Sequence, residues 1–257
     1  MTAAEPVIFE PQGDPLDTYQ LLLEQSGCSA SALRPEALAD PVPPDQPTLS
    51  LADILSKPQA FRALLQGVAV HQGSDTRTLA SVLHQNLALQ VIGPLVVELF
   101  LDGQTTLPEP SAIWLDLTDM SGQWHFERRG TKVGKEEFIE QVADQTRDWY
   151  RVFRKELGVS AGAYWSSTGL AFCAPYSALY KQAPPASLCR QATDWLQGFD
   201  CDAHRFIDWI PFSVDQQPCA IPQRRGCCQK YRLPEGAYCG TCGIYRKERL
   251  KSQGTPT

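Results

Sequence analysis

Residues 224–243 of the 257-residue chain read RRGCCQKYRLPEGAYCGTCG, a stretch that we call the cysteine segment. It brings together Cys227, Cys228, Cys239 and Cys242 in the order C-C-x10-C-x2-C. The C-x2-C half is a common metal-binding knuckle, because the short turn between its cysteines lets both sulfurs face the same side. The spacing therefore predicts one metal site with these four thiolates as ligands.

The cysteine segment has little apolar surface with which to fold on its own. Its large apolar side chains are Tyr231, Leu233 and Tyr238. Burial of three such side chains cannot offset the conformational entropy lost when the whole segment becomes ordered. In comparable small domains, ligation of a metal supplies the missing stability. We therefore expect a metal to hold this part of the chain together.

The spacing does not decide the identity of the metal. A structural zinc site places four ligands around one tetrahedral ion, and adjacent cysteines such as Cys227 and Cys228 are awkward there because consecutive side chains diverge. A [2Fe-2S] cluster spreads four thiolates over two iron atoms, which relaxes that demand. Zinc and a [2Fe-2S] cluster both stay open at this point.

The residues around the four cysteines resemble a known family. The run from Arg224 to Pro234, followed by Cys239-Gly240-Thr241-Cys242, closely resembles the C-terminal segment of the FhuF family of ferric-siderophore reductases. A second element, Trp165-Ser166-Ser167-Thr168-Gly169, is similar to a W-S-N-x-G element of that family, with Ser167 in place of asparagine. The resemblance implies a [2Fe-2S] cluster held by all four cysteines. It also implies a helical body related to a domain of siderophore synthetases.

An activity follows from the same resemblance. A ferric-siderophore reductase passes one electron from its cluster to an iron(III)-siderophore, here expected to be of the hydroxamate type. Iron(II) is then released, because the hard oxygen donors of the siderophore hold it more weakly. No catalytic residue beyond the cluster is required. The side chains that we expect to contact the siderophore are Trp165, Arg225, Tyr231 and Arg232.

The electrons must come from a separate donor, such as a ferredoxin, a flavodoxin or a reductase, because the chain has no dinucleotide-binding fingerprint. The run from Gly130 to Lys135 also lacks the spacing of a P-loop. Two alternative functions stay open. One is a zinc-stapled module that binds a protein or RNA. The other is a [2Fe-2S] redox sensor or electron relay that binds no siderophore.

Charge and composition limit the partners and the compartment. A formal net charge of −6 argues against a nucleic-acid-binding protein, although residues 224–251 are basic. Residues 1–10 show no basic region followed by an apolar one, so we expect a cytoplasmic protein. Its nine cysteines would then stay reduced rather than form disulfides. Loose attachment to the cytoplasmic face of the inner membrane stays open.

The rest of the sequence predicts an α+β fold with a mostly helical body, a small antiparallel sheet and a C-terminal iron–sulfur segment. Apolar residues at helical spacing, bounded by capping residues and glycines, predict the helices. They cover about 14–27, 50–54, 58–66, 75–101, 135–157, 168–181 and 186–196. The helix over 75–101 is too polar for a membrane span and should be kinked at Gly93-Pro94.

Short alternating runs predict strands at 112–117, 123–127 and 206–212, of which the first two should form a hairpin. Closely spaced prolines predict an extended connector over 39–47. We accordingly divide the chain into three parts. Residues 1–48 form a helical segment with the connector, residues 49–215 the siderophore-binding body with the sheet, and residues 216–257 the [2Fe-2S] segment.

Overall fold

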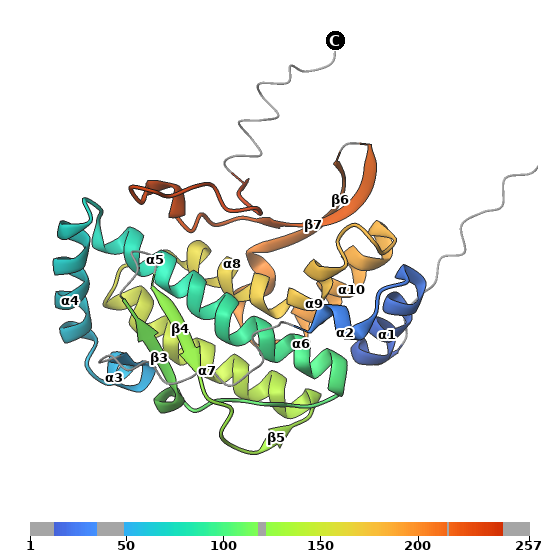
Figure 1. The fold of residues 1–257 in the computed structure, drawn as a ribbon, viewed down its shortest axis with the longest axis horizontal. Coiled ribbons are helices and arrows are strands. Elements are labelled where there is room, and N and C mark those ends of the chain that lie inside the picture. Colours follow the sequence, from blue (N-terminus) through green and yellow to red (C-terminus); the bar gives the residue numbers. More distant parts are fainter. Residues whose placement is uncertain (1–12, 35–48, 118–121, 215, 244–257) are drawn as a thin grey trace, which may run out of the picture.

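The computed structural model describes residues 13–34, 49–117, 122–214 and 216–243 (Figure 1). Helices make up most of this part of the chain and pack around one core, with small sheets at its edge. The mainly helical α+β class is confirmed. The helices are α1 Pro15–Ser26, α2 Ala30–Leu33, α3 Leu51–Ser56, α4 Pro58–His71, α5 Thr76–Leu87, α6 Gly93–Asp102, α7 Lys135–Lys155, α8 Ala161–Phe172, α9 Ala174–Ala178 and α10 Pro185–Gln197.

Capping side chains fix the starts of several helices where the sequence predicts them. Asp14, Ser50 and Asp75 each accept a hydrogen bond from a backbone N–H in the first turn of α1, α3 and α5. These bonds satisfy amides that have no partner within the helix. Gly27 ends α1 in the left-handed conformation, with φ of 64°. The predicted helix over 58–66 was too short, since α4 continues past Gln66 and ends at His71.

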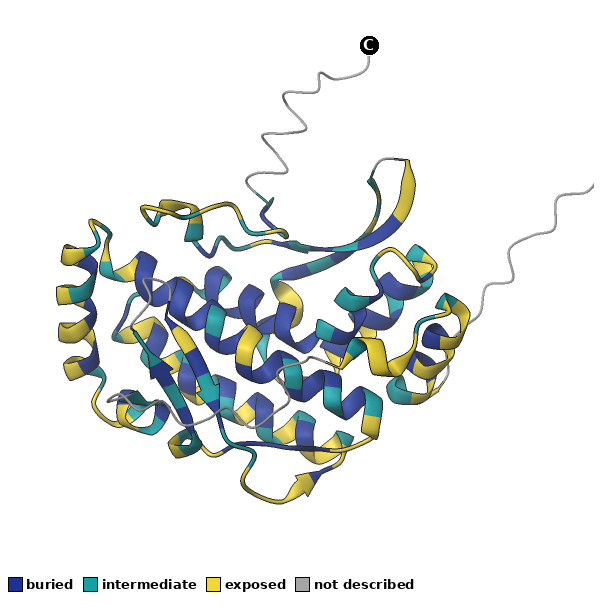
Figure 2. Cartoon of the chain, in the orientation of Figure 1, coloured by how far each residue is buried: buried dark blue, intermediate teal, exposed yellow. Residues whose placement is uncertain are grey.

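The kink predicted at Gly93-Pro94 takes the form of a π-helical turn. This turn covers Ala88–Ile92 and joins α5 to α6. A proline lacks the N–H that an α-helix needs, and the wider turn lets the chain continue without a sharp break. The stretch Thr76–Asp102 is long and apolar enough to cross a membrane, but 78% of its most apolar window is buried in the protein. Figure 2 shows the same burial along α5 and α6, so this is a core helix.

The strands form small antiparallel sheets. Strands β1 Leu49–Ser50, β3 Ile113–Asp116 and β4 Gln123–Phe126 lie in the order β1-β3-β4. The register pairs Leu115 with Trp124, and both side chains are buried against the body. This confirms the predicted hairpin, of which residues 118–121 lie outside the described residues. Strands β2 Thr105–Thr106 and β5 Lys132–Val133 form a second pair.

A longer hairpin leads into the cysteine segment. Its strands are β6 Ile207–Val214 and β7 Gln217–Arg224, and Figure 1 shows them extending away from the body beside α10. Strand β6 was predicted, but β7 was missed because Pro218 and Pro222 disfavour a strand. Prolines are tolerated here because β7 pairs with one neighbouring strand only, so positions that face away from β6 need no N–H to donate to a further strand.

Helix α8 runs through the centre of the core. The sequence predicts a helix starting at Thr168, but α8 begins at Ala161, where Ser160 caps it. Residues 163–172 are all buried. Because the helix is apolar or small on every side, no amphipathic stripe marks its first turns, and this explains the error.

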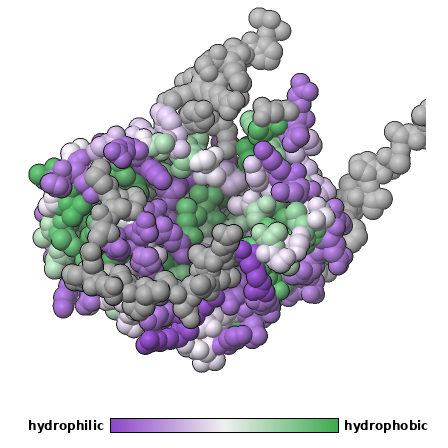
Figure 3. Space-filling view, viewed as in Figure 1, coloured by the Kyte–Doolittle hydropathy of each residue, from purple (hydrophilic) through white to green (hydrophobic). Residues whose placement is uncertain are grey.

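The outside of the body is mainly polar. Figure 3 shows hydrophilic side chains over much of one face, with apolar groups gathered on the side where α4 lies. Leu64 and Val70 of α4 are among the exposed large apolar side chains. The three-part division of the chain stays a prediction, and the expected connector over 39–47 lies outside the described residues.

A buried histidine on α5 should make the stability of the fold depend on pH. The ring of His84 stacks on Tyr164 with centroids 3.8 Å apart and is 1% exposed. Burial, and to a smaller degree the charge of Arg224, lowers the pKa of His84 from 6.5 to about 3. The unfolded chain binds a proton at this histidine below pH 6.5, whereas the folded chain does not until about pH 3. This contribution to stability is therefore complete above pH 6.5 and is lost as the pH falls toward 3.

Between pH 7 and pH 5 we expect the loss to reach about 2 kcal/mol. Urea unfolding followed by tryptophan fluorescence at the two pH values measures it. The variant His84→Phe keeps an aromatic ring but cannot titrate, and it should lose about 2 kcal/mol less than the unmodified protein over this range. An equal loss in both proteins would show that His84 does not carry the pH dependence.

Candidate metal centre

The hairpin delivers the cysteine segment to one end of α8. Strand β7 ends at Arg224, and the chain then passes the first turn of α8 before it reaches Cys227 and Cys228. It turns back at residues 230–238 and returns with Cys239 and Cys242. All four cysteines line one cavity of about 260 Å³. Its other lining residues are Gln223, Arg224, Arg225, Gly226 and Gly243.

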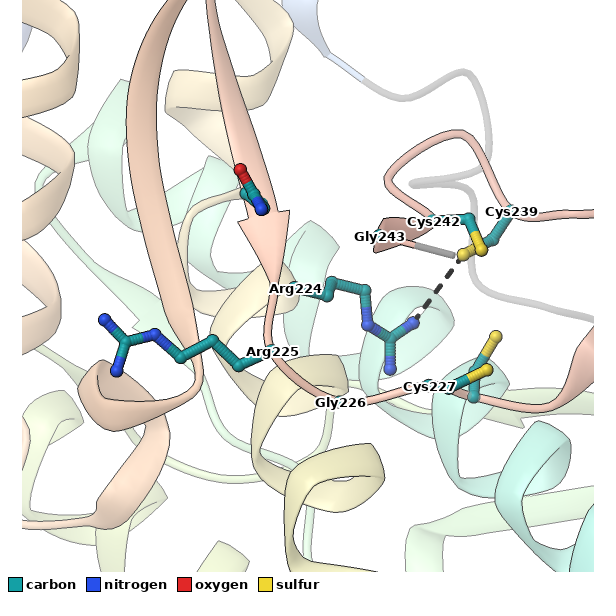
Figure 4. Close-up of a pocket in the computed structure, with 9 residues that line it drawn as sticks. Arg224, Arg225, Gly226, Cys227, Cys239, Cys242 and Gly243 are labelled. Atoms are coloured by element: carbon teal, nitrogen blue, oxygen red, sulfur yellow. Dashed lines mark hydrogen bonds between the residues drawn. The ribbon is translucent and has the colours of Figure 1, made fainter. Parts of the chain in front are cut away.

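The thiols face each other across this cavity. Figure 4 shows the sulfurs of Cys239 and Cys242 together on one side, with Cys227 opposite and directed toward them. Within the described ranges, no three Cys, His, Asp or Glu side chains are placed to hold a single metal ion. A [2Fe-2S] cluster needs no such convergence, because its four thiolates are shared by two iron atoms. The described residues that line the cavity offer four thiols and no carboxylate or imidazole, a donor set that fits this cluster.

Backbone amides point at the sulfurs. The N–H of Gln229 donates to Cys227 Sγ at 3.3 Å, and the N–H groups of Lys230 and Thr241 donate to Cys228 and Cys239. Gln229 adopts the left-handed conformation, with φ of 64°, so the chain turns sharply directly after the two adjacent cysteines. Amide hydrogen bonds to sulfur stabilise thiolates and raise the potential of iron–sulfur clusters.

Electrostatics prepare one of the thiols for deprotonation. The thiol of Cys228 donates to the sulfur of Cys239, which lowers the pKa of Cys239 and raises that of Cys228. The charge of Arg224 adds to the decrease for Cys239 and offsets only part of the increase for Cys228. By contrast, burial raises the pKa of Cys189 and of Cys201 to about 11, in keeping with inert structural thiols. Burial also raises the pKa of Cys227. Lowering of a thiol pKa is therefore seen at Cys239 and not at the whole cysteine segment.

A contact between two backbones seats the cysteine segment on α8. A Cβ added to Gly226 would lie 1.9 Å from Gly162 O and 2.6 Å from Ala163 N. Only a glycine permits so close an approach of two chains. The residue before Cys227 is thereby fixed against the first turn of a buried helix.

The element Trp165–Gly169, which the sequence singled out, meets the cysteine segment through Arg224. The guanidinium group donates from Nε to Ser166 Oγ at 3.0 Å and from Nη2 to Ser167 Oγ at 2.7 Å. Ser167 thus makes a side-chain contact at the position where the family's element has asparagine. Sequence reasoning missed this role of Arg224, because it looks like one more residue of a basic surface.

A second set of contacts ties the segment to α5. Gln229 Oε1 accepts a hydrogen bond from Thr78 Oγ1 at 3.0 Å. Arg232 forms an ion pair with Asp75 at 3.3 Å. The segment therefore bridges α5 and α8, and neither Thr78 nor Gln229 carried a signal in the sequence.

The four residues predicted to contact a siderophore have different environments. Trp165 is only 2% exposed and packs against Tyr150 and Tyr164. Its contact with a siderophore stays a prediction. Trp165 is buried because α8 runs through the centre of the core, where all of residues 163–172 are buried. Arg225 extends away from the cysteines and binds both carboxylate oxygens of Asp208 at 2.6 Å (Figure 4).

The other two lie at the surface of the cysteine segment and are not among the residues that line the cavity. Tyr231 is 39% exposed and stacks on Tyr238 with ring centroids 5.1 Å apart. Arg232 is half-exposed and paired with Asp75, as described above. An aromatic pair and a basic group thus stand at the outer edge of the cysteine segment.

Residues 224–242 match the FhuF 2Fe-2S C-terminal domain. This FhuF 2Fe-2S domain contains all four cysteines as well as Arg224, so the predicted resemblance and the [2Fe-2S] cofactor are confirmed. It is the domain of an iron–sulfur protein of the siderophore-iron reductase type. The match does not extend into the helical body, and no curated protein matches the chain.

Proposed function

We propose that the protein is a ferric-siderophore reductase that works in the cytoplasm. One electron from a separate donor, such as a ferredoxin, a flavodoxin or a reductase, would convert siderophore-bound iron(III) to iron(II). The proposed cluster ligands are Cys227, Cys228, Cys239 and Cys242. A bound [2Fe-2S] cluster supplies the one-electron chemistry. The observation that carries the proposal is that these four thiols line a single cavity inside a FhuF 2Fe-2S domain.

The site lies where a bulky chelate can approach it. Cys227 and Cys239 are only partly buried, and the stacked pair Tyr231–Tyr238 lies exposed on the same segment. Flat aromatic faces and the basic side chain of Arg232 suit a large chelate whose iron is wrapped in oxygen donors. Hydroxamate siderophores are the proposed substrates, because their hard oxygens release iron once it is reduced.

The proposed activity can be tested by reoxidation of the protein. The purified protein is reduced with dithionite under nitrogen and desalted, and ferrioxamine is then added. Its visible absorption should return, and about one iron(II) per cluster should be trapped by ferrozine, since each cluster delivers one electron. Gallium-loaded siderophore is the matched control, because it has nearly the same shape and charge but cannot be reduced.

Each alternative gives a different outcome in this experiment. An electron relay or sensor would be reoxidised by ferricyanide but not by ferrioxamine, and that result would overturn the proposed substrate while leaving the cofactor intact. A zinc-stapled module would be colourless and release zinc to a chelator.

A further inference from the structure

Arg224 is a buried arginine with no carboxylate beside it in the part of the chain that the structure describes. It is 4% exposed. Its hydrogen-bond acceptors on α8 are Ser166 Oγ, Ser167 Oγ and, at 3.2 Å, Ala163 O, all of which are neutral. Among the described residues, no carboxylate oxygen lies within 4.0 Å of its guanidinium nitrogens.

The neighbouring arginine shows the contrast. Arg225 is exposed and binds Asp208 through two hydrogen bonds. Burying a charge without a counter-charge costs several kcal/mol, so charged side chains in protein interiors are normally paired. Arg225, whose charge is solvated at the surface, has a carboxylate partner. Arg224, whose charge is buried, has no such partner among the described residues.

The fourth contact of Arg224 points to what balances its charge. Its Nη1 lies 4.0 Å from Cys239 Sγ and faces the cavity that the four cysteines line (Figure 4). A [2Fe-2S] cluster held by four thiolates would make this cavity strongly anionic. The hydroxyl groups of Ser166 and Ser167 hold the guanidinium plane in place, so that it presents Nη1 to the cavity.

We propose that Arg224 is a positioning residue of the cluster site, whose buried charge compensates the anionic cluster and raises its reduction potential. An added electron makes the cluster more negative, and a fixed cation beside it stabilises the reduced form more than the oxidised form. Residues of the segment Trp165–Gly169 do not line the cavity, but Ser166 and Ser167 influence the cluster indirectly because they hold the side chain of Arg224 in place. The proposal depends on the cluster and not on the siderophore substrate.

Redox titration monitored by EPR tests the role of the charge. The variant Arg224→Gln should shift the reduction equilibrium at least tenfold toward the oxidised cluster, which corresponds to about 59 mV for a one-electron couple. Arg224→Lys keeps the charge and should lie between Arg224→Gln and the unmodified protein. Arg205→Gln is the matched control, because it removes an equal charge from an exposed position whose partner is Asp202. It should leave the potential unchanged.

A purely structural role for Arg224 gives a different result. In that case Arg224→Gln would hold less iron, but its remaining clusters would have the potential of the Arg205→Gln control. This result would overturn the proposal, as would equal potentials in all the variants.

A second measurement uses the unmodified protein and therefore does not depend on how well the variants fold. Protein grown with arginine labelled with 15N in the guanidinium group is reduced and studied by pulsed EPR. We expect hyperfine coupling between the cluster and a guanidinium nitrogen, because Arg224 Nη1 contacts a ligand sulfur. Spectra without any 15N coupling would show that no guanidinium lies at the cluster, and would also overturn the proposal.

Discussion

Cys239→Ser should abolish cluster binding while leaving the helical body folded. Cys239 receives contacts from Arg224, from Cys228 and from Thr241, and these together favour its thiolate. Serine offers a hard oxygen that stays protonated at neutral pH, so one iron would lose a ligand. Removing a partner outside the ligand shell of a metal already costs 10- to 100-fold in affinity. Loss of a ligand should therefore lower the iron content at least about tenfold.

Iron and acid-labile sulfide are measured after anaerobic reconstitution, together with visible absorption. Far-UV circular dichroism reports on the body, which should be unaffected because its core does not include the cysteine segment. Cys28→Ser is a suitable control, since this half-buried thiol follows α1 and lies outside the cysteine segment. If Cys239→Ser retained both iron and sulfide, the four proposed ligands would be the wrong set.

Gly226→Ala should loosen the cysteine segment without touching any ligand. The new methyl group would lie 2.0 Å from Gly162 C and 2.6 Å from Ala163 N, both of which belong to the backbone of a buried helix. No side chain can move aside to make room, so the segment itself must shift. Overpacking of this kind costs on the order of 1–3 kcal/mol. Because each 1.4 kcal/mol corresponds to about tenfold, we expect the cluster to be lost to an iron chelator about five- to 150-fold faster.

Gly240→Ala separates this steric effect from a general sensitivity of the segment. Gly240 lies between two of the proposed ligands, yet an added Cβ would meet nothing within 4 Å. This variant should lose its cluster at the rate of the unmodified protein. Equal rates for Gly226→Ala and Gly240→Ala would mean that the approach to α8 does not hold the cluster site.

Features encoded over short stretches could be predicted well. Asp14 and Ser50 cap the helices that follow them, because a capping hydrogen bond joins residues only two or three positions apart. The hairpin of β3 and β4 followed from alternation and a short turn. Strand β7 was missed because local sequence alone was considered. Its prolines disfavour a strand locally, and only its place at a sheet edge permits them.

The four proposed cluster ligands could be singled out from the sequence. Cys227, Cys228, Cys239 and Cys242 lie within one short segment, so their spacing alone indicates a shared site, and the family match covers the same residues. Other members of the site are spread along the chain. Thr78, Ser166 and Ser167 reach the segment from α5 and α8, more than fifty residues away in sequence.

Arg224 and Trp165 show what tertiary packing decided. In the sequence, Arg224 and Arg225 are adjacent and chemically identical, yet one is buried against α8 and the other pairs with Asp208 at the surface. Trp165 lies in the element that resembles the family, but the core of the body buries it. Ligand identity depends on the chemistry and spacing of neighbouring residues, whereas burial depends on which surfaces meet when distant segments fold together. Only the second requires the complete fold.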